Sequence, residues 1–364
     1  MVTFWVNILA LSMLLYVLLD GFDLGVGILF GVIGGDTERR LMMGAVEPVW
    51  DGNETWLVVT AVVLWGAFPI VYSILLSAFY LPLFLMLAGL ILRGVAFEYR
   101  AKTQGLRWVW DAAFAGGSLV AAFMQGLTVG SLVEGLPVAG TLYTGGAFTW
   151  LSPFALLCGV GLCIGYALLG ACWLVKKCDG DVRETAYRLI PLLSIALLVF
   201  LIVVFVYALA ENLQVMHRWL ERPILFIFPI VGALASLVLA LNVIYRRDNT
   251  PFYMVALIFS AAFGTLAISF WPYIDDRERS RSTLQPCLHV LGRWSFRLSS
   301  DAGLHCDQLL RFSWEGQSRG CRLLNLVVGG CRLSRLAPIA PAPHLARRIR
   351  RPPPSSPYFF SVRL

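Results

Sequence analysis

Two carboxylates stand inside a long apolar run near the start of the chain. The stretch YVLLDGFDLGVG, residues 16–27, contains Asp20 and Asp23, which are three positions apart and so share one face of a helix. An aspartate at the centre of a membrane helix costs about 2.5–3.5 kcal/mol, so such residues usually face a bundle interior or a wet cavity. The pair indicates a proton or ion relay. The structural alternative is that both acids are hydrated at a membrane boundary.

A second polar group, EPVWDGNETW at residues 47–56, combines three acids with one asparagine and two tryptophans. Asp51 and Asn53 are good helix-capping residues, and a carboxylate is favourable near a helix N-terminus. Trp56 is of the type that lines membrane interfaces. The functional alternative is that Asp51 marks the cytoplasmic mouth of a proton path, and the residues alone favour neither.

A third group, LRGVAFEYRAK at residues 92–102, contains Arg93, Glu98 and Arg100 at the end of an apolar run. An ion pair with arginines that snorkel toward water is the favoured interpretation, and a relay role for Glu98 is the alternative. Glycines at four-residue spacing, Gly21 with Gly25 and Gly27 with Gly31, permit close helix packing in lipid.

The composition is that of an integral membrane protein. The 364 residues are 58% hydrophobic and 14% charged, where soluble domains carry about a quarter charged residues. The residues before the first apolar run, 1–5, include no Lys or Arg, so we expect that run to remain as a helix and not to be a signal peptide.

Uncharged runs predict an all-α bundle of eight transmembrane helices, since roughly 20 apolar residues span the hydrocarbon core. Residues 55–92 contain no charge and are long enough for two crossings, with a break at 69–73. The other predicted spans are 4–34, 112–133, 153–175, 189–210, 223–245 and 251–273.

The loop charges predict the orientation of these helices. Of the 14 Lys and Arg residues in 1–274, 12 lie in or near every second loop between the predicted helices, all on one side of the membrane. The other two, Arg218 and Arg222, lie in a loop on the opposite side. By the positive-inside rule the 12 lie in the cytoplasm, which places the N-terminus in the periplasm and the end of the last predicted helix outside.

The chain divides at about residue 273 into a membrane bundle, 1–273, and an Arg-, Pro- and Ser-rich tail, 274–364. Residues 275–364 contain 15 Arg, no Lys and 6 acids, so the net charge of +7 belongs to the tail and does not indicate nucleic-acid binding by the bundle. The tail is either a basic extension that binds anionic lipid or a partner, or a disordered out-of-frame translation of a GC-rich gene. We favour the second, because the first places fifteen arginines on the side that should lack them.

Few residues in the bundle could bind a cofactor. Its one histidine, His217, lies in a predicted outside loop, and a buried redox haem needs axial ligands that are usually His or Met. The chain contains no P-loop and no HExxH motif. We therefore expect it to bind no metal and no cofactor directly.

Several motifs, taken in order, resemble subunit II of the cytochrome bd-type quinol oxidases, with details closer to the cyanide-insensitive branch. They are DGFDLGVGIL, DTERR, EPVWDGNETWLV, FYLPLFLMLAGLILRGVAFEYR, WDAAFAGGSL, YTGGAFTWLSPFALLCGVGL and GTLAISFWPY. The resemblance covers about residues 1–273. The family has nine transmembrane helices, and the tail stands where the ninth would be.

The resemblance implies a non-haem subunit of a respiratory terminal oxidase in the bacterial inner membrane, which oxidises quinol and reduces O2 to water. Subunit I, with or without a small third subunit, would be the partner. It would carry the quinol site, b-type haems, and haem d or a further haem b. Cytoplasmic protons would be consumed, so turnover would generate proton-motive force.

The resemblance also assigns roles to individual residues. It implies proton-path candidates at Asp51 and Glu98. At the position of Glu98, many relatives carry Asp. Asp20 and Asp23 would be buried acids near the subunit I boundary. Trp56, with Asn53 in the same motif, would lie beside an O2 route or a subunit contact.

Two other functions stay open at this point. One is a secondary transporter that couples proton flow through the acids to solute movement, although the sequence shows no convincing internal repeat. The other is a purely structural scaffold subunit.

Overall fold

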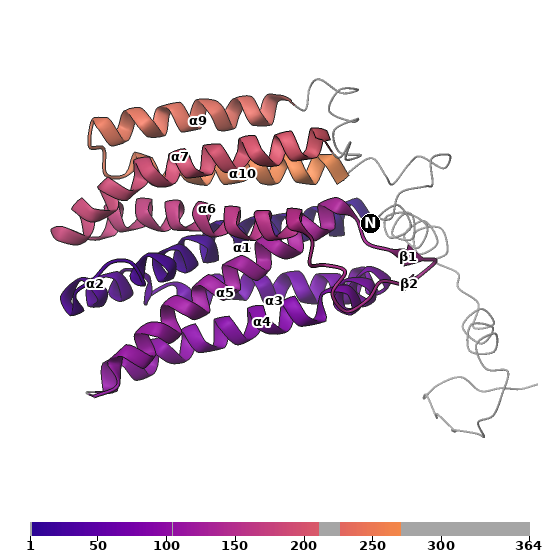
Figure 1. Ribbon diagram of the computed structural model, residues 1–364, viewed down its shortest axis with the longest axis horizontal. Coiled ribbons are helices and arrows are strands. Elements are labelled where there is room, and N and C mark those ends of the chain that lie inside the picture. Colours follow the sequence, from indigo (N-terminus) through magenta and orange to yellow (C-terminus); the bar gives the residue numbers. More distant parts are fainter. Residues whose placement is uncertain (1, 104, 211–225, 271–364) are drawn as a thin grey trace, which may run out of the picture. The chain divides into compact units, whose positions relative to one another are not determined.

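A computed structural model describes residues 2–103, 105–210 and 226–270. These ranges contain nine helices and one short hairpin (Figure 1), which confirms the predicted all-α bundle. The elements are α1 (Val2–Phe30), α2 (Asp36–Val46), α3 (Trp50–Ala67), α4 (Pro69–Lys102), α5 (Arg107–Glu134), β1 (Val138–Ala139), β2 (Leu142–Tyr143), α6 (Pro153–Lys177), α7 (Asp181–Ala210), α9 (Ile227–Ile244) and α10 (Thr250–Phe270).

Within the described ranges, seven helices are long and apolar enough to cross a membrane: α1, α4, α5, α6, α7, α9 and α10. The helix α3 occupies the first half of the uncharged run but does not qualify, and it begins with the polar residues of EPVWDGNETW. The count of eight spans and the periplasmic N-terminus therefore stay predictions. The predictions for the tail concern residues 274–364, which lie outside the described ranges.

The break predicted at 69–73 is confirmed by the boundary between α3 and α4. Phe68 leaves helical geometry with φ −135° and ψ 56°, and Pro69 begins the next helix. Proline suits this first position because its missing N–H would have no helical acceptor there. Inside α4, Pro82 lacks the N–H that would bond to Ala78, and the helix kinks at the neighbouring Phe79.

The helix α2 was not predicted, because it lies between the predicted spans 4–34 and 55–92. It is only 11 residues long and amphipathic, with Met42, Met43 and Val46 buried against the bundle. Its charged first turn lies beside the start of α5 and the end of α4, as the ion pairs described below show. A helix this short cannot span a bilayer and so leaves no long apolar run in the sequence.

The first helix, α1, lies inside the bundle and packs against α3, α5 and α6 (Figure 1). Its glycines allow this close approach, as their spacing predicted. A Cβ on Gly25 would stand 1.8 Å from the carbonyl oxygen of Tyr166, and one on Gly27 would stand 2.0 Å from Oγ of Ser118. The backbones of α1 and α6 are therefore in direct contact, which places the acids of α1 in the interior.

Candidate functional site

Asp20 and Asp23 lie on the buried face of α1, in the bundle interior. Their exposed fractions are 0% and 1%, so the alternative of hydrated boundary residues is wrong. Carboxylates this deeply buried require partners, because an unpaired buried charge is strongly destabilising. The partners come from α3 and α4.

Arg93 of α4 is the cation of this group and is itself 0% exposed. Its Nη2 donates to Oδ1 of Asp20 at 2.9 Å and to Oε1 of Glu54 on α3. The expectation that Arg93 snorkels toward water is therefore wrong. Two carboxylates from neighbouring helices offset the cost of burying the guanidinium, and its planar donors can serve both at once.

Asn53 joins the second aspartate to α3. Its Nδ2 donates to Oδ2 of Asp23 at 2.7 Å and to the carbonyl of Leu19 at 3.2 Å. The alternative in which Asn53 or Asp51 caps α3 is wrong, since the N-cap is Val49 and makes no side-chain cap. Asn53 instead lies within α3, where its amide donates to a buried carboxylate.

We call these five residues the Arg93 cluster: Asp20, Asp23, Asn53, Glu54 and Arg93. The cluster contains one guanidinium and three carboxyl groups, so its full ionisation would leave two uncompensated negative charges in a buried place. Buried carboxyl groups in such excess require further polar partners.

Glu54 is the part of the cluster that reaches the surface, because its side chain is 24% exposed. It lies three residues after Asp51, which is exposed in the first turn of α3. Positions three apart on a helix are neighbours, so the two carboxylates follow each other from the surface inward. Sequence reasoning did not single out Glu54, although the concentration of acids in EPVWDGNETW was a signal.

Two other residues named from the sequence lie apart from the cluster. Glu98 is 70% exposed near the end of α4, where it pairs with Lys102 at 3.1 Å. Trp56 is partly exposed on α3, and its backbone carbonyl accepts a hydrogen bond from the Thr60 hydroxyl. Neither side chain contributes to the contacts of the Arg93 cluster.

A second buried polar group was not foreseen. Gln125 of α5 donates to the Tyr16 hydroxyl at 2.6 Å and accepts from the Tyr166 hydroxyl at 2.9 Å, which joins α1, α5 and α6. Tyr16 lies one turn before Asp20, so this group continues the polar interior along α1. Its members are isolated in apolar segments and leave no local pattern in the sequence.

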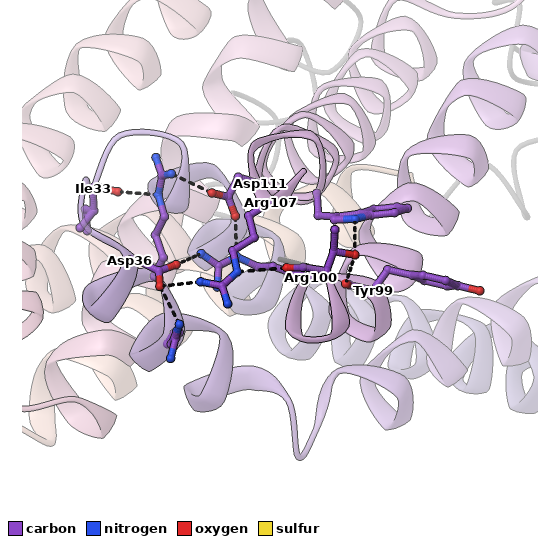
Figure 2. Close-up of polar contacts among 10 residues, drawn as sticks. Ile33, Asp36, Tyr99, Arg100, Arg107 and Asp111 are labelled. Carbon is purple, nitrogen blue, oxygen red and sulfur yellow. Dashed lines mark hydrogen bonds and ion pairs between the residues drawn. The ribbon is translucent and has the colours of Figure 1, made fainter. Parts of the chain in front are cut away.

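Charged residues at the end of α4 form a third group, shown in Figure 2, around Asp36 and Asp111. Arg100 donates to Oδ1 of Asp36 at 2.9 Å and also to Asp111, while Arg39 donates to Asp111 at 2.9 Å. Arg107 donates to Oδ2 of Asp36 at 3.1 Å. These bonds tie α2 to α4 and α5.

The environment of Asp36 favours its ionised form. Partial desolvation acts in the opposite direction, but the hydrogen bond from Arg100 and the charges of Arg40, Arg100 and Arg107 hold the pKa of Asp36 below its usual value. This group is best explained as an anchor for α2, since its members lie at the ends of helices.

The described residues include no histidine that could ligate a haem. They contain no group of three or more His, Cys, Asp or Glu side chains placed to hold a metal ion. All four histidines, His217, His289, His305 and His344, lie outside the described ranges. The lack of a directly bound cofactor stays a prediction.

The fold and the Arg93 cluster define a class: a polytopic membrane protein with paired charges buried in its interior. A family model described as cytochrome bd terminal oxidase subunit II matches residues 1–286. The chain belongs to this family. Its members are subunits of a quinol:O2 oxidoreductase of aerobic respiration and work with subunit I of the complex, so family membership favours the oxidase over the transporter alternative.

Individual relatives agree with the family match. The chain is 33% identical to "Probable cytochrome oxidase subunit 2" of Haemophilus influenzae and 31% identical to "Cytochrome bd-I ubiquinol oxidase subunit 2" of Escherichia coli K12. Each alignment covers 74% of this chain and 80% of the relative. The solved bd oxidase from Geobacillus thermodenitrificans has the same fold, with a TM-score of 0.62 at 15% identity over 87% of this chain and 99% of that chain.

Proposed function

We propose that this chain is the non-haem subunit II of a bacterial inner-membrane quinol oxidase, where it stabilises subunit I and helps to supply protons for O2 reduction. Subunit I would hold the quinol site, haem b, and haem d or a further haem b. Family membership supports the first part of this proposal. The Arg93 cluster supports the second, because it joins buried acids to a carboxylate that reaches the surface.

The proposed proton route follows the carboxyl groups inward. Asp51 is exposed at the start of α3, Glu54 is partly exposed one turn later, and Asp20 and Asp23 are buried beyond them. Carboxyl groups whose protonated and ionised forms are close in energy are suited to passing protons. Turnover that consumes cytoplasmic protons along this route would generate proton-motive force.

Glu98 and Trp56, which lie apart from the Arg93 cluster, have smaller roles in this proposal. Glu98, paired with Lys102 at the surface, would collect protons without touching the buried acids. Trp56 is partly exposed on the same helix as Asp51, which supports a contact with the partner subunit or an O2 route beside it.

Quinol-dependent O2 uptake by the purified two-subunit complex tests the route. We expect Asp23→Asn and Asp51→Asn each to lower turnover at least tenfold, since proton transfer by a positioned group contributes about 10²–10⁴-fold to a rate. Glu184→Gln, at an exposed ion pair with Arg246 away from this route, is the matched control and should change turnover less than twofold. Haem content and subunit ratio, measured on each variant, separate lost proton transfer from lost assembly.

Normal turnover in both aspartate variants, with normal assembly, would contradict the proton route. That outcome would leave the chain as a structural scaffold for subunit I.

A further inference from the structure

The last turn of α6 carries two lysines whose charges are not neutralised. Among the described residues, Lys176 and Lys177 contact aromatic side chains and no acid. The exposed Lys102 of α4, by contrast, pairs with Glu98. Nζ of Lys176 donates to the Tyr253 hydroxyl of α10 at 3.0 Å. An ammonium has three N–H groups, so Lys176 keeps two for another acceptor.

Three aromatic side chains from α6 and α10 hold these ammonium groups in place. Nζ of Lys176 lies 4.4 Å from the centre of the Tyr253 ring, and the Phe252 and Trp173 ring centres are at 5.2 Å and 5.9 Å. Nζ of Lys177 lies 5.2 Å from the centre of the Trp173 ring. The face of a ring attracts a cation but does not neutralise it. The two lysines are therefore positioned in advance for an anion.

An apolar groove begins one turn further along α10. It has a volume of about 300 Å³ and is lined by Ile227, Phe228 and Val231 of α9 and by Leu257, Ser260 and Ala261 of α10. Leu257 is four residues after Tyr253 and so lies on the same helix face. At about 1.5 Å per residue, Leu257 and Ala261 are about 6 Å and about 12 Å from Tyr253 along the helix. Half of a hydrocarbon core about 30 Å thick extends deeper than this, so an acyl chain that starts near Tyr253 reaches the groove.

The lysines and the groove together select an anion with an apolar chain. A soluble phosphate would use the lysines and leave the groove empty. The amine of a zwitterionic lipid would meet two positive charges and no acid. Trp173 and Tyr253 are of the types enriched at membrane–water interfaces, which is the level of lipid headgroups. Basic pockets between transmembrane helices bind such headgroups on the cytoplasmic side, where the loop charges place this end of α6.

We propose that Lys176, Lys177 and Tyr253 bind the phosphate of an anionic phospholipid, with one acyl chain in the groove between α9 and α10. The two ammonium groups pair with the phosphate, and the Tyr253 hydroxyl donates to it while it accepts from Lys176. One lipid molecule thereby joins α6 to α10 at this end of the bundle. The site has no part in the proposed proton route, so normal turnover of Asp23→Asn would overturn that route and leave the lipid site standing.

Photocrosslinking of the intact two-subunit complex in lipid nanodiscs tests the site. The probes are phosphatidylglycerol and phosphatidylcholine that carry the same photoreactive acyl chain, and mass spectrometry locates the labelled residues. Each lysine near a membrane surface adds roughly a fivefold preference for anionic lipid. We therefore expect phosphatidylglycerol to label the groove at least about tenfold more than phosphatidylcholine.

Two variants test the proposed contacts. Lys176→Gln combined with Lys177→Gln should reduce labelling by phosphatidylglycerol to the level of phosphatidylcholine. Tyr253→Phe keeps the ring and removes one hydrogen-bond donor, so it should reduce that labelling about fivefold. Lys102→Gln removes an exposed charge of α4 that is paired with Glu98, and as the matched control it should change labelling less than twofold.

Equal labelling of the wild-type groove by the two probes would overturn the proposal, and so would full labelling of the double lysine variant. If an excess of inorganic phosphate abolishes the labelling while chloride at the same ionic strength does not, the site is one for soluble anions and the lipid proposal is wrong. If the double variant does not assemble, the ratio of the two probes on the wild type and the result for Tyr253→Phe still decide.

Discussion

The contact between α1 and α6 leaves no room for a side chain at Gly25. A Cβ there would lie 1.8 Å from the Tyr166 carbonyl oxygen and 2.9 Å from the Gly170 nitrogen. Ordinary contact begins at 3.4 Å, so Gly25→Ala requires the two helices to separate by about 1.6 Å. Both obstructing groups are backbone, and no rotation of a side chain relieves the clash.

The expected cost follows from this separation. A radial gap of 0.5–1 Å already removes about a quarter to a half of the dispersion attraction between facing atoms. Overpacking in a close-packed interior typically costs about 1–3 kcal/mol. We expect the destabilisation caused by Gly25→Ala to lie at the upper end of this range, about 3 kcal/mol. The reason is that the two helices must separate along a backbone contact that also positions Asp20 and Asp23.

Reversible unfolding of the purified chain by SDS titration measures this free energy. Gly31→Ala is the matched control, since its Cβ would stand 3.2 Å from the Ala115 Cβ, where a few tenths of an ångström suffice. A free energy of unfolding for Gly25→Ala within 0.5 kcal/mol (roughly the effect of an ordinary surface substitution) of the control would refute the reasoning.

Further predictions concern the three polar groups. Arg93→Met should lower the free energy of unfolding by about 3–5 kcal/mol, because it leaves buried carboxylates unpaired. Adding Asp20→Asn to this variant should restore part of the lost stability. If SDS titration shows no restoration, the pairing of Arg93 with Asp20 is contradicted. Gln125→Leu should cost about 1–3 kcal/mol by the same measurement, since it removes the partner of two buried tyrosine hydroxyls. Because the pKa of Asp36 is lowered on folding, its stabilisation is present above the unfolded pKa of about 3.9 and is lost as pH falls through the folded value. The melting temperature of Asp36→Asn should therefore be below that of the wild type at pH 6.5, and it should fall less than that of the wild type between pH 4.5 and 3. Parallel plots of melting temperature against pH for the two proteins would contradict this.

Much of the fold was predictable because a bilayer imposes local requirements on a chain. A crossing needs roughly 20 apolar residues in succession, so α5, α6 and α10 appear in the sequence as continuous runs. Pro69 marked its helix boundary because a proline has a defined effect on the backbone around it. The short helix α2 escaped prediction, since 11 amphipathic residues resemble a charged loop as much as a helix.

The candidate site was predictable in part. The cost of a buried carboxylate made Asp20 and Asp23 stand out, and the motif DGFDLGVG, together with EPVWDGNETW, carried the family resemblance. The sequence left open whether Asn53 belongs to a helix cap or to a proton-path motif, because its buried partner comes from another helix. Arg93 was placed at the surface, since an arginine near a helix end is usually able to reach water.

The sequence by itself therefore determined the class of protein, most of its apolar spans and the two buried acids, because each depends on neighbouring residues. The tertiary structure decided which groups those acids meet. Arg93 is 73 residues from Asp20, and Asn53 is 30 residues from Asp23. No local pattern records which helix faces pack together, so the Arg93 cluster exists only in the folded bundle.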